Sequence, residues 1–251
     1  MTIPTLWWLL PLFFIGAFVY SSVGHGGGSA YLAIMAFTTL AQPTIRSTAL
    51  VLNIVVATAG FISYHRAQHF QWRLLLPFAV GSVPLAFVGG LRLLSPKTFS
   101  LVLGATLALS AVRLVFLNKP IEARAHLSDR LLWVTGPPIG AALGLLAGMV
   151  GVGGGIFLSP LLLFLGWADT KKTAAVSAAF ILINSISGLV AQMQKQPLDW
   201  QLIAPSTAVV LVAGIIGSRL GANRLSPLWL QRLLSLVLII AAAKMLMQAF
   251  K

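Results

Sequence analysis

The chain contains no cysteine, and only 4 of its 251 residues are aspartate or glutamate. The absence of cysteine excludes disulfides, a thiol nucleophile and thiolate ligands for a metal ion. The four acids all fall in polar stretches between apolar segments: Glu122, Asp129, Asp169 and Asp199. No carboxylate is therefore placed for a buried cation site or for a proton relay inside a membrane. We expect no metal site and no cofactor, and no combination of nucleophile, base and acid indicates an enzyme.

Apolar residues dominate the composition. Hydrophobic residues make up 58% of the chain and charged residues 8%, and the mean hydropathy is +0.94. A soluble domain of this size could not bury so much apolar surface, so we expect an integral membrane protein in a lipid bilayer. The net charge is +13, but the basic residues punctuate the apolar segments and form no single stripe. This pattern favours membrane topology and an anionic substrate or lipid over nucleic acid.

Apolar segments follow one another along the whole chain, and turn signals separate most of them. They span approximately residues 5–23, 29–40, 47–64, 73–91, 98–117, 131–150, 156–166, 173–192, 201–221 and 229–249. The segments 29–40 and 156–166 are too short to cross a membrane core, which needs about 20 residues. Segment 5–23 has no basic stretch ahead of it, so we expect a helix of the mature protein and not a signal peptide.

Each short segment follows a run of glycines, and the two runs match position for position. The first contains Gly24, Gly26, Gly27 and Gly28, and the second contains Gly151, Gly153, Gly154 and Gly155. Such runs do not hold an ordinary helix, because each glycine costs about 1 kcal/mol relative to alanine. A broken backbone inside an apolar segment, present twice at matching places, is typical of a transporter binding site. The alternative is that these small residues only allow helices to pack closely.

The duplication extends well beyond the glycines. Trp72 and Pro77 recur 128 residues later as Trp200 and Pro205, Gly60 recurs as Gly188, and Leu94-Ser95-Pro96 recurs as Leu225-Ser226-Pro227. The sequence therefore predicts two homologous transmembrane repeats, 1–117 and 131–251, joined by a polar linker at 118–130.

The distribution of positive charge bears on how the two repeats are oriented. If each short segment belongs to a hairpin that returns to its own side, the repeats are inverted. Eleven of the 17 lysines and arginines then share the linker's side of the membrane. If each broken segment makes one net crossing, the repeats are parallel and the bases divide almost evenly. The positive-inside rule favours inverted repeats, a cytoplasmic linker and periplasmic termini.

The glycine runs predict a binding site for a small anion. Helices are expected to begin directly after each run, and their first amides lack intrahelical partners at the positive end of the helix dipole. Two such ends meeting near the membrane midplane would form a group of N–H donors suited to an oxyanion. His25 and Ser29 can add side-chain donors in the first repeat. Val152 and Ile156 stand at the equivalent places in the second, so we expect an asymmetric site.

Polar residues inside other apolar segments are further candidates for substrate contacts. Asn53, Asn184 and Gln192 stand where unpaired amides are costly. Hydrogen bonding between helices is the alternative for all three. His25 is the one histidine placed at the proposed site, and its ordinary pKa range would suit proton coupling. A structural role, donating to a backbone carbonyl, is the alternative for His25.

These motifs resemble those of a known family. The duplicated Gly-x-Gly-Gly-Gly run, with Ser159-Pro160 after the second copy, is similar to the sulfite exporter/sulfonate uptake permease family of TauE/SafE-like transporters. The paired Trp-x4-Pro stretches and Leu-Ser-Pro turns extend the resemblance over essentially the whole chain. The resemblance implies movement of sulfite, thiosulfate or organosulfonates across the bacterial inner membrane, with the eight motif glycines contacting the anion.

Together these observations predict an all-α polytopic membrane protein of two homologous, inverted repeats, whose glycine-broken helices meet near the midplane. We expect it to carry a small anion by alternating access, and a homodimer is possible. Two rival functions stay open: export of another organic solute such as an amino acid, and a non-transporting membrane partner protein.

Overall fold

The computed structural model describes residues 3–35, 37–91, 101, 104, 108, 123 and 127–249. The regular elements of these residues are all helices: α1 (Ile3–Ser22), α2 (Gly28–Met35), α3 (Gln42–Arg66), α4 (Trp72–Leu91), α6 (Asp129–Val150), α7 (Gly155–Leu165), α8 (Thr170–Met193), α9 (Trp200–Arg219), η1 (Leu220–Arg224) and α10 (Pro227–Ala249). Within this part of the chain, five helices are long and apolar enough to cross a membrane. The predicted all-α polytopic class is confirmed.

Several predictions concern residues outside the described part of the chain. They include segment 98–117, the Leu94-Ser95-Pro96 turn and most of the linker at 118–130.

Helix α3 begins earlier than the apolar pattern indicates. It begins at Gln42, and Pro43 occupies its first turn, whereas the apolar segment starts at residue 47. Proline is favoured in a first turn, because its fixed φ suits a helix and its missing N–H is not needed there. The Gln42-Pro43 signal therefore marks a helix start, and the polar residues after it are helical.

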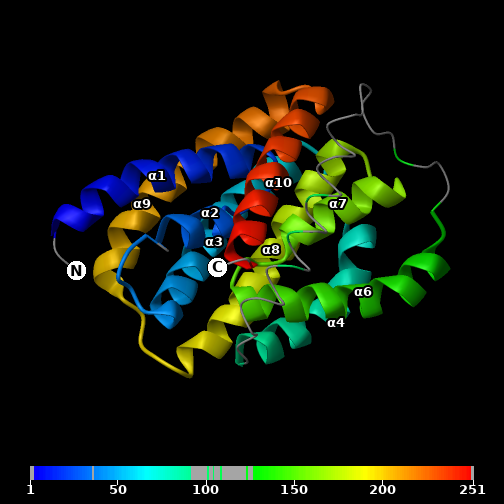
Figure 1. Ribbon diagram of the computed structural model, residues 1–251. Helices are drawn as coiled ribbons and strands as arrows, with labels where there is room; N and C mark the ends of the chain where they lie inside the picture. Colours follow the sequence, from blue (N-terminus) through cyan, green and yellow to red (C-terminus); the bar gives the residue numbers. More distant parts are fainter. Residues whose placement is uncertain are drawn as a thin grey trace.

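Helices from the two predicted repeats alternate in space. Helix α1 lies beside α9, helix α4 lies beside α6, and α3 and α8 pack together between these pairs (Figure 1). By the repeat alignment, α1 to α4 correspond to α6 to α9. The α1–α9 contact and the α6–α4 contact are thus equivalent, and each repeat completes the packing of the other.

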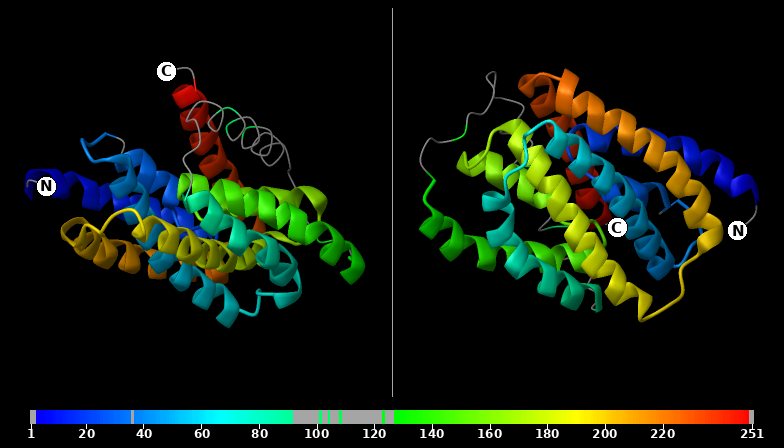
Figure 2. Two further views of the ribbon diagram at one scale, coloured as in Figure 1. Left: turned by 90° about the horizontal axis from the view of Figure 1, so that it is seen from below. Right: turned by 180° about the vertical axis from the view of Figure 1, so that it is seen from behind.

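Helices α3 and α8 run antiparallel at the centre of the molecule. A Cβ on Gly60, near the end of α3, would lie 3.5 Å from the Cβ of Ala178, near the start of α8. A Cβ on Gly188, near the end of α8, would lie 3.7 Å from Leu50 Cδ1, near the start of α3. The two helices run side by side when the molecule is seen from behind (Figure 2).

The outer helix pairs are held together by small residues. A Cβ on Gly140 or Gly144 of α6 would overlap a backbone carbonyl of α4, that of Phe78 or Ser82. In the same way, a Cβ on Gly217 of α9 would overlap the Phe18 carbonyl of α1. Glycine lets helix backbones approach this closely, which is the common way for helices to pack inside membranes.

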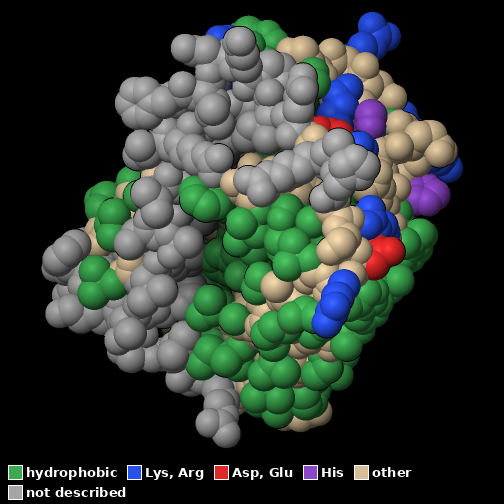
Figure 3. All heavy atoms as spheres, turned by 90° about the vertical axis from the view of Figure 1, so that its right-hand side faces the viewer, with side chains coloured by type: hydrophobic (Ala, Val, Ile, Leu, Met, Phe, Trp, Pro, Cys, Tyr) green, Lys and Arg blue, Asp and Glu red, His purple; other side chains and the backbone are tan. Residues whose placement is uncertain are grey.

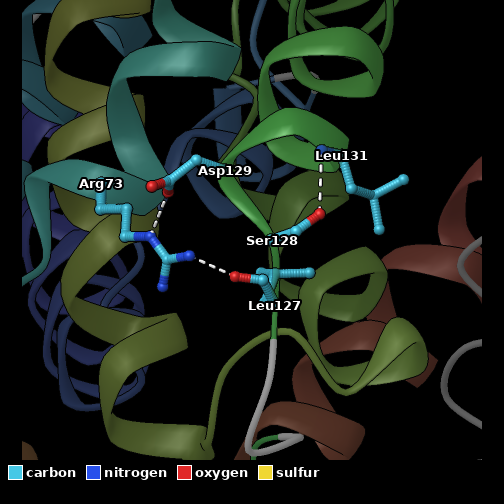
Figure 4. A network of polar contacts seen from close by, with 5 residues as sticks. All are labelled: Arg73, Leu127, Ser128, Asp129 and Leu131. Carbon is cyan, nitrogen blue, oxygen red and sulfur yellow. Dashed lines mark hydrogen bonds and ion pairs between the residues drawn. The ribbon is translucent and has the colours of Figure 1, made fainter.

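Charged side chains are unevenly distributed over the described surface. On the face shown in Figure 3, Lys, Arg, His and acidic side chains gather along one edge, and hydrophobic side chains cover most of the remaining coloured surface. At the start of α6, Arg73 pairs with Asp129 and donates to the Leu127 carbonyl, while the Ser128 side chain accepts from the Leu131 amide (Figure 4). These contacts tie the first helix of the second repeat to α4.

Candidate functional site

Both glycine runs break a helix, as predicted. Helix α1 ends at Ser22 and α2 begins at Gly28; helix α6 ends at Val150 and α7 begins at Gly155. Left-handed backbone recurs at matching positions: Gly24 (φ 75°) with Gly151 (φ 82°), and Gly27 (φ 88°) with Gly154 (φ 80°). Residues with a Cβ rarely adopt this conformation, so the break depends on glycine at these places.

The two breaks meet at a buried point. Every residue from 21 to 29 and from 151 to 160 is buried, and the His25 ring lies against the backbone of Gly155. His25 is 2% exposed. Its Nδ1 donates to the Val23 carbonyl over 3.1 Å, and no hydrogen bond of good geometry engages its Nε2. A neutral ring that donates from Nδ1 presents a lone pair at Nε2, and only a protonated ring would present a second donor there.

Asn53 of α3 lies directly against the first glycine run. Its side chain is fully buried, and a Cβ on Gly26 or on Gly28 would overlap its amide group. Neither Oδ1 nor Nδ2 of Asn53 has a hydrogen-bond partner. Leaving a buried polar group unpaired costs about 1–3 kcal/mol. Asn53 thus places two unsatisfied polar atoms directly at the helix break.

The matching position in the second repeat is apolar. At the repeat spacing of 128, Asn53 corresponds to Ile181 of α8, and a Cβ on Gly153 or Gly155 would overlap the Ile181 side chain. Asn53 and Ile181 thus occupy equivalent positions beside the two breaks, but one side chain is polar and the other is apolar. At this pair of positions, the buried region where the two breaks meet is asymmetric.

Two tyrosines that the sequence analysis did not single out lie beside the first break. Ser29 Oγ donates to Tyr20 Oη over 2.9 Å, so the Ser29 hydroxyl is engaged within the protein. Tyr31 is fully buried, and its hydroxyl lies under Gly27 without a partner. Both tyrosines fall in apolar segments, where their rings look like ordinary core residues in sequence.

Asn184 and Gln192 differ from Asn53. Gln192 Nε2 donates to the Gly90 carbonyl of α4 over 2.9 Å, which is the helix–helix bond named as the alternative. Asn184 Nδ2 donates to the Phe180 carbonyl one turn earlier in its own helix over 2.8 Å, and its Oδ1 has no partner. The structure does not place Gln192 beside the two glycine runs.

Arg46 is a charged residue near the second break that the sequence analysis did not propose. A Cβ on Gly151 would lie 3.5 Å from Arg46 Cβ, and Arg46 Nη1 is buried without a partner. Its counterpart in the second repeat is Ala174, which lies against Gly24. Both ion pairs among the described residues use other bases. The sequence does carry a signal for Arg46. This base follows closely after the proline that starts a helix, where the positive end of the helix dipole disfavours a cation.

The described residues contain no group of three His, Asp or Glu side chains that could hold a metal ion. A polytopic helical bundle whose two broken helices meet at a buried centre has the architecture of a secondary transporter. The family profile described as "Sulfite exporter TauE/SafE" matches residues 9–245. The chain belongs to this family of membrane transporters.

Curated relatives match over most of their length. "Probable membrane transporter protein y4hK" of Sinorhizobium fredii is 34% identical over 248 residues, covering 93% of this chain and 95% of the relative. "Probable membrane transporter protein YunE" of Bacillus subtilis is 26% identical and covers 85% of this chain and 86% of its own. "Probable sulfite/organosulfonate exporter TauE" of Cupriavidus necator is 26% identical, with 84% of each chain covered. No solved structure matches the chain.

Proposed function

We propose that this protein is a secondary transporter that moves a small sulfur-containing oxyanion, such as sulfite, thiosulfate or an organosulfonate, across the bacterial inner membrane by alternating access. The observation that carries the proposal is the meeting of the α2 and α7 N-termini beside the unpaired amide of Asn53. Helix N-termini offer free amides and a favourable dipole to an anion. The name of the Cupriavidus necator relative, a probable sulfite/organosulfonate exporter, favours sulfur oxyanions as the substrate class.

The substrate in this proposal lies between the glycine breaks and contacts mainly the first repeat. The backbones of Gly26, Gly27 and Gly28 approach the anion, and Asn53 Nδ2 donates to one of its oxygens. The second run, Gly151, Gly153, Gly154 and Gly155, closes the other side against Ile181. Ile181 suits the apolar part of an organosulfonate, or fills that space when the substrate is a bare oxyanion.

Arg46 and His25 supply charge in the proposed mechanism. Arg46 lies with its Cβ and Cγ beside Gly151, and in this proposal its guanidinium attracts the anion from the side of the membrane where α3 begins. His25 binds a proton at Nε2 before it donates to the anion, because Nδ1 is committed to the Val23 carbonyl. Substrate and proton then occupy the site together, which couples anion movement to the proton gradient.

Alternating access requires two orientations of similar energy, and inverted repeats provide them. The antiparallel packing of α3 on α8, which are equivalent helices of the two repeats, supports an inverted arrangement. The closely packed α1–α9 and α4–α6 pairs would move as units about the glycine breaks. The proposed topology keeps the linker cytoplasmic and both termini periplasmic.

Substrate binding tests the proposal directly. Thermal unfolding of the purified protein can be followed by the fluorescence of its 7 tryptophans, with no cysteine available for a thiol dye. We expect stabilisation by one of sulfite, thiosulfate or a short alkylsulfonate, and none by chloride, acetate or a neutral amino acid at equal concentration. A ligand at 100 times its Kd stabilises by about 2.7 kcal/mol.

A matched pair of variants locates the binding site. The shift should be lost in Asn53→Leu and retained in Gln192→Leu, since only Asn53 contacts the glycine run. Equal stabilisation by acetate or an amino acid would refute the substrate class. An unchanged shift in Asn53→Leu would refute the site.

A further inference from the structure

A groove with an arginine-rich end lies on the opposite side of α3 from the glycine breaks. It has a volume of about 890 Å³ and is lined by α3, α9, η1 and Phe18 of α1. Asn53 faces the breaks, while Val55, two residues further along α3, lines the groove. Residues two apart on an α-helix differ by about 200° of rotation about the helix axis, so their side chains point to nearly opposite sides. The groove is therefore separate from the proposed substrate site.

The groove is apolar along most of its length and basic at one end. Its walls include Val55, Ile62, Leu211 and Ile215, and its end carries three arginines: Arg66, Arg219 and Arg224. Arg66 is the last residue of α3 and Arg219 the last of α9. All three arginines are exposed, and neither ion pair among the described residues involves them.

A turn of π-helix gathers two of these arginines. The α9 helix continues into η1, where the Leu225 amide donates to the Leu220 carbonyl, five residues earlier, over 2.9 Å. Residues five apart point in more similar directions in a π-helix than in an α-helix, which agrees with Arg219 and Arg224 both lining the groove. Such π turns are rare and often occur at functional sites.

We infer that this groove binds an anionic phospholipid, with the phosphate held by Arg66, Arg219 and Arg224 and an acyl chain lying along the apolar walls. The charge at the end of the groove fits a phosphodiester, and no described acid lines the groove to compete for the arginines. The walls of Val55, Ile62, Leu211 and Ile215 fit hydrocarbon. Basic pockets between transmembrane helices are suited to anionic headgroups in this way. The inference depends on the membrane location of the chain and not on the identity of its substrate.

Lipid retention measured by native mass spectrometry tests this inference. Purified protein is incubated with phosphatidylglycerol or phosphatidylcholine of identical acyl chains. We expect wild-type protein to retain phosphatidylglycerol selectively. The triple variant Arg66→Gln/Arg219→Gln/Arg224→Gln should bind it about 100-fold more weakly, since each arginine near an anionic lipid contributes about fivefold. Arg73→Gln, which removes an exposed arginine elsewhere, is the control and should bind like wild type.

A second variant tests the apolar part of the groove. Ile215→Trp narrows the groove and leaves the arginines in place, so it should also weaken retention of phosphatidylglycerol. Equal retention of both lipids by wild-type protein, or unchanged retention in the triple variant, would overturn the inference. A dimer that the triple variant converts to a monomer, without any effect on lipid, would instead identify a second copy of the chain as the occupant. Sulfur oxyanion binding in these variants should be unaffected, which separates this test from that of the transport function.

Discussion

Asn53 and Ile181 stand at equivalent positions of the two repeats, and each packs against the glycine break of its own repeat. Asn53 brings two unpaired polar atoms to this contact, whereas Ile181 brings an aliphatic side chain. An aliphatic group therefore satisfies the packing at this position. Packing alone does not account for the amide of Asn53, which in the proposed function binds the anion.

Replacing Asn53 with leucine should separate stability from function. Asn53→Leu removes a buried amide that has no partner, so thermal stability should rise by about 1 kcal/mol or more while transport is lost. Gln192→Leu breaks a hydrogen bond to the Gly90 carbonyl, so it should lower stability by about 1 kcal/mol and leave transport intact. Unfolding curves and flux into proteoliposomes measure both effects. A destabilised Asn53→Leu protein with normal flux would contradict this assignment.

The glycine next to Asn53 should not tolerate a methyl group. A Cβ on Gly26 would overlap Asn53 Oδ1, so Gly26→Ala should displace the amide and lower transport at least tenfold. Gly60→Ala in the same α3 helix is the control, because its Cβ would lie 3.5 Å from that of Ala178, an ordinary contact. Alanine there should be neutral or slightly stabilising. Equal activity of the two variants, at equal amounts in the membrane, would count against a close approach of substrate to the break.

Arg46 should control the capture of the anion. Arg46→Gln removes the charge of a side chain whose stem lies beside Gly151, and we expect its KM for the transported anion to rise about tenfold with a smaller change in kcat. Arg46→Lys keeps the charge and should recover part of the loss. Initial rates at several substrate concentrations give both constants, and higher ionic strength should weaken the wild type more than Arg46→Gln. Identical KM values for Arg46→Gln and Arg46→Lys would exclude a charge effect.

The pH dependence of flux tests His25. If its Nε2 carries the coupled proton, His25→Gln should make anion flux insensitive to an imposed pH gradient, although binding persists more weakly. The measurement is uptake into vesicles with the interior held at a different pH from the exterior. Flux that still follows the gradient in His25→Gln would leave His25 with the structural role of donating to the Val23 carbonyl.

His69 should make stability depend on pH. It lies in the connection between α3 and α4, and Nε2 is 3.3 Å from the Ala222 carbonyl. Burial, followed by the nearby Lys171 ammonium, lowers the pKa of His69 below its ordinary 6.5. The folded state thus favours the neutral ring. The stability this contributes is present above pH 6.5 and is lost as the pH falls through the lower pKa of the folded state.

Thermal unfolding between pH 8 and pH 5 measures this effect. His69→Gln should lose less stability than wild type on acidification, while His65→Gln, at an exposed position nearby, should follow wild type. A His69→Gln curve parallel to that of wild type would rule out this contribution.

Helix positions and the two breaks could be predicted from the sequence alone, and the sequence also predicts the duplication. Apolar length and glycine conformation are local properties, so segments such as 73–91 and 156–166 agree with α4 and α7 to within one residue. The apolar pattern did not predict the start of α3 at Gln42, although Pro43 indicates it. The family followed from the motifs, and the comparisons confirmed it.

Which polar residues lie together at the two breaks depends on how the helices pack. Asn53 and Gln192 look alike in sequence, but the former faces Gly26 and the latter bonds to Gly90 of another helix. The partner of a buried amide depends on how α3 and α8 pack, which no periodicity within one segment encodes. The same holds for Arg46 beside Gly151 and for the three arginines of the groove. Arg46 reaches Gly151, and Arg66 reaches Arg219, only through contacts between segments more than 100 residues apart, and these contacts form only when α3 packs against the second half of the chain.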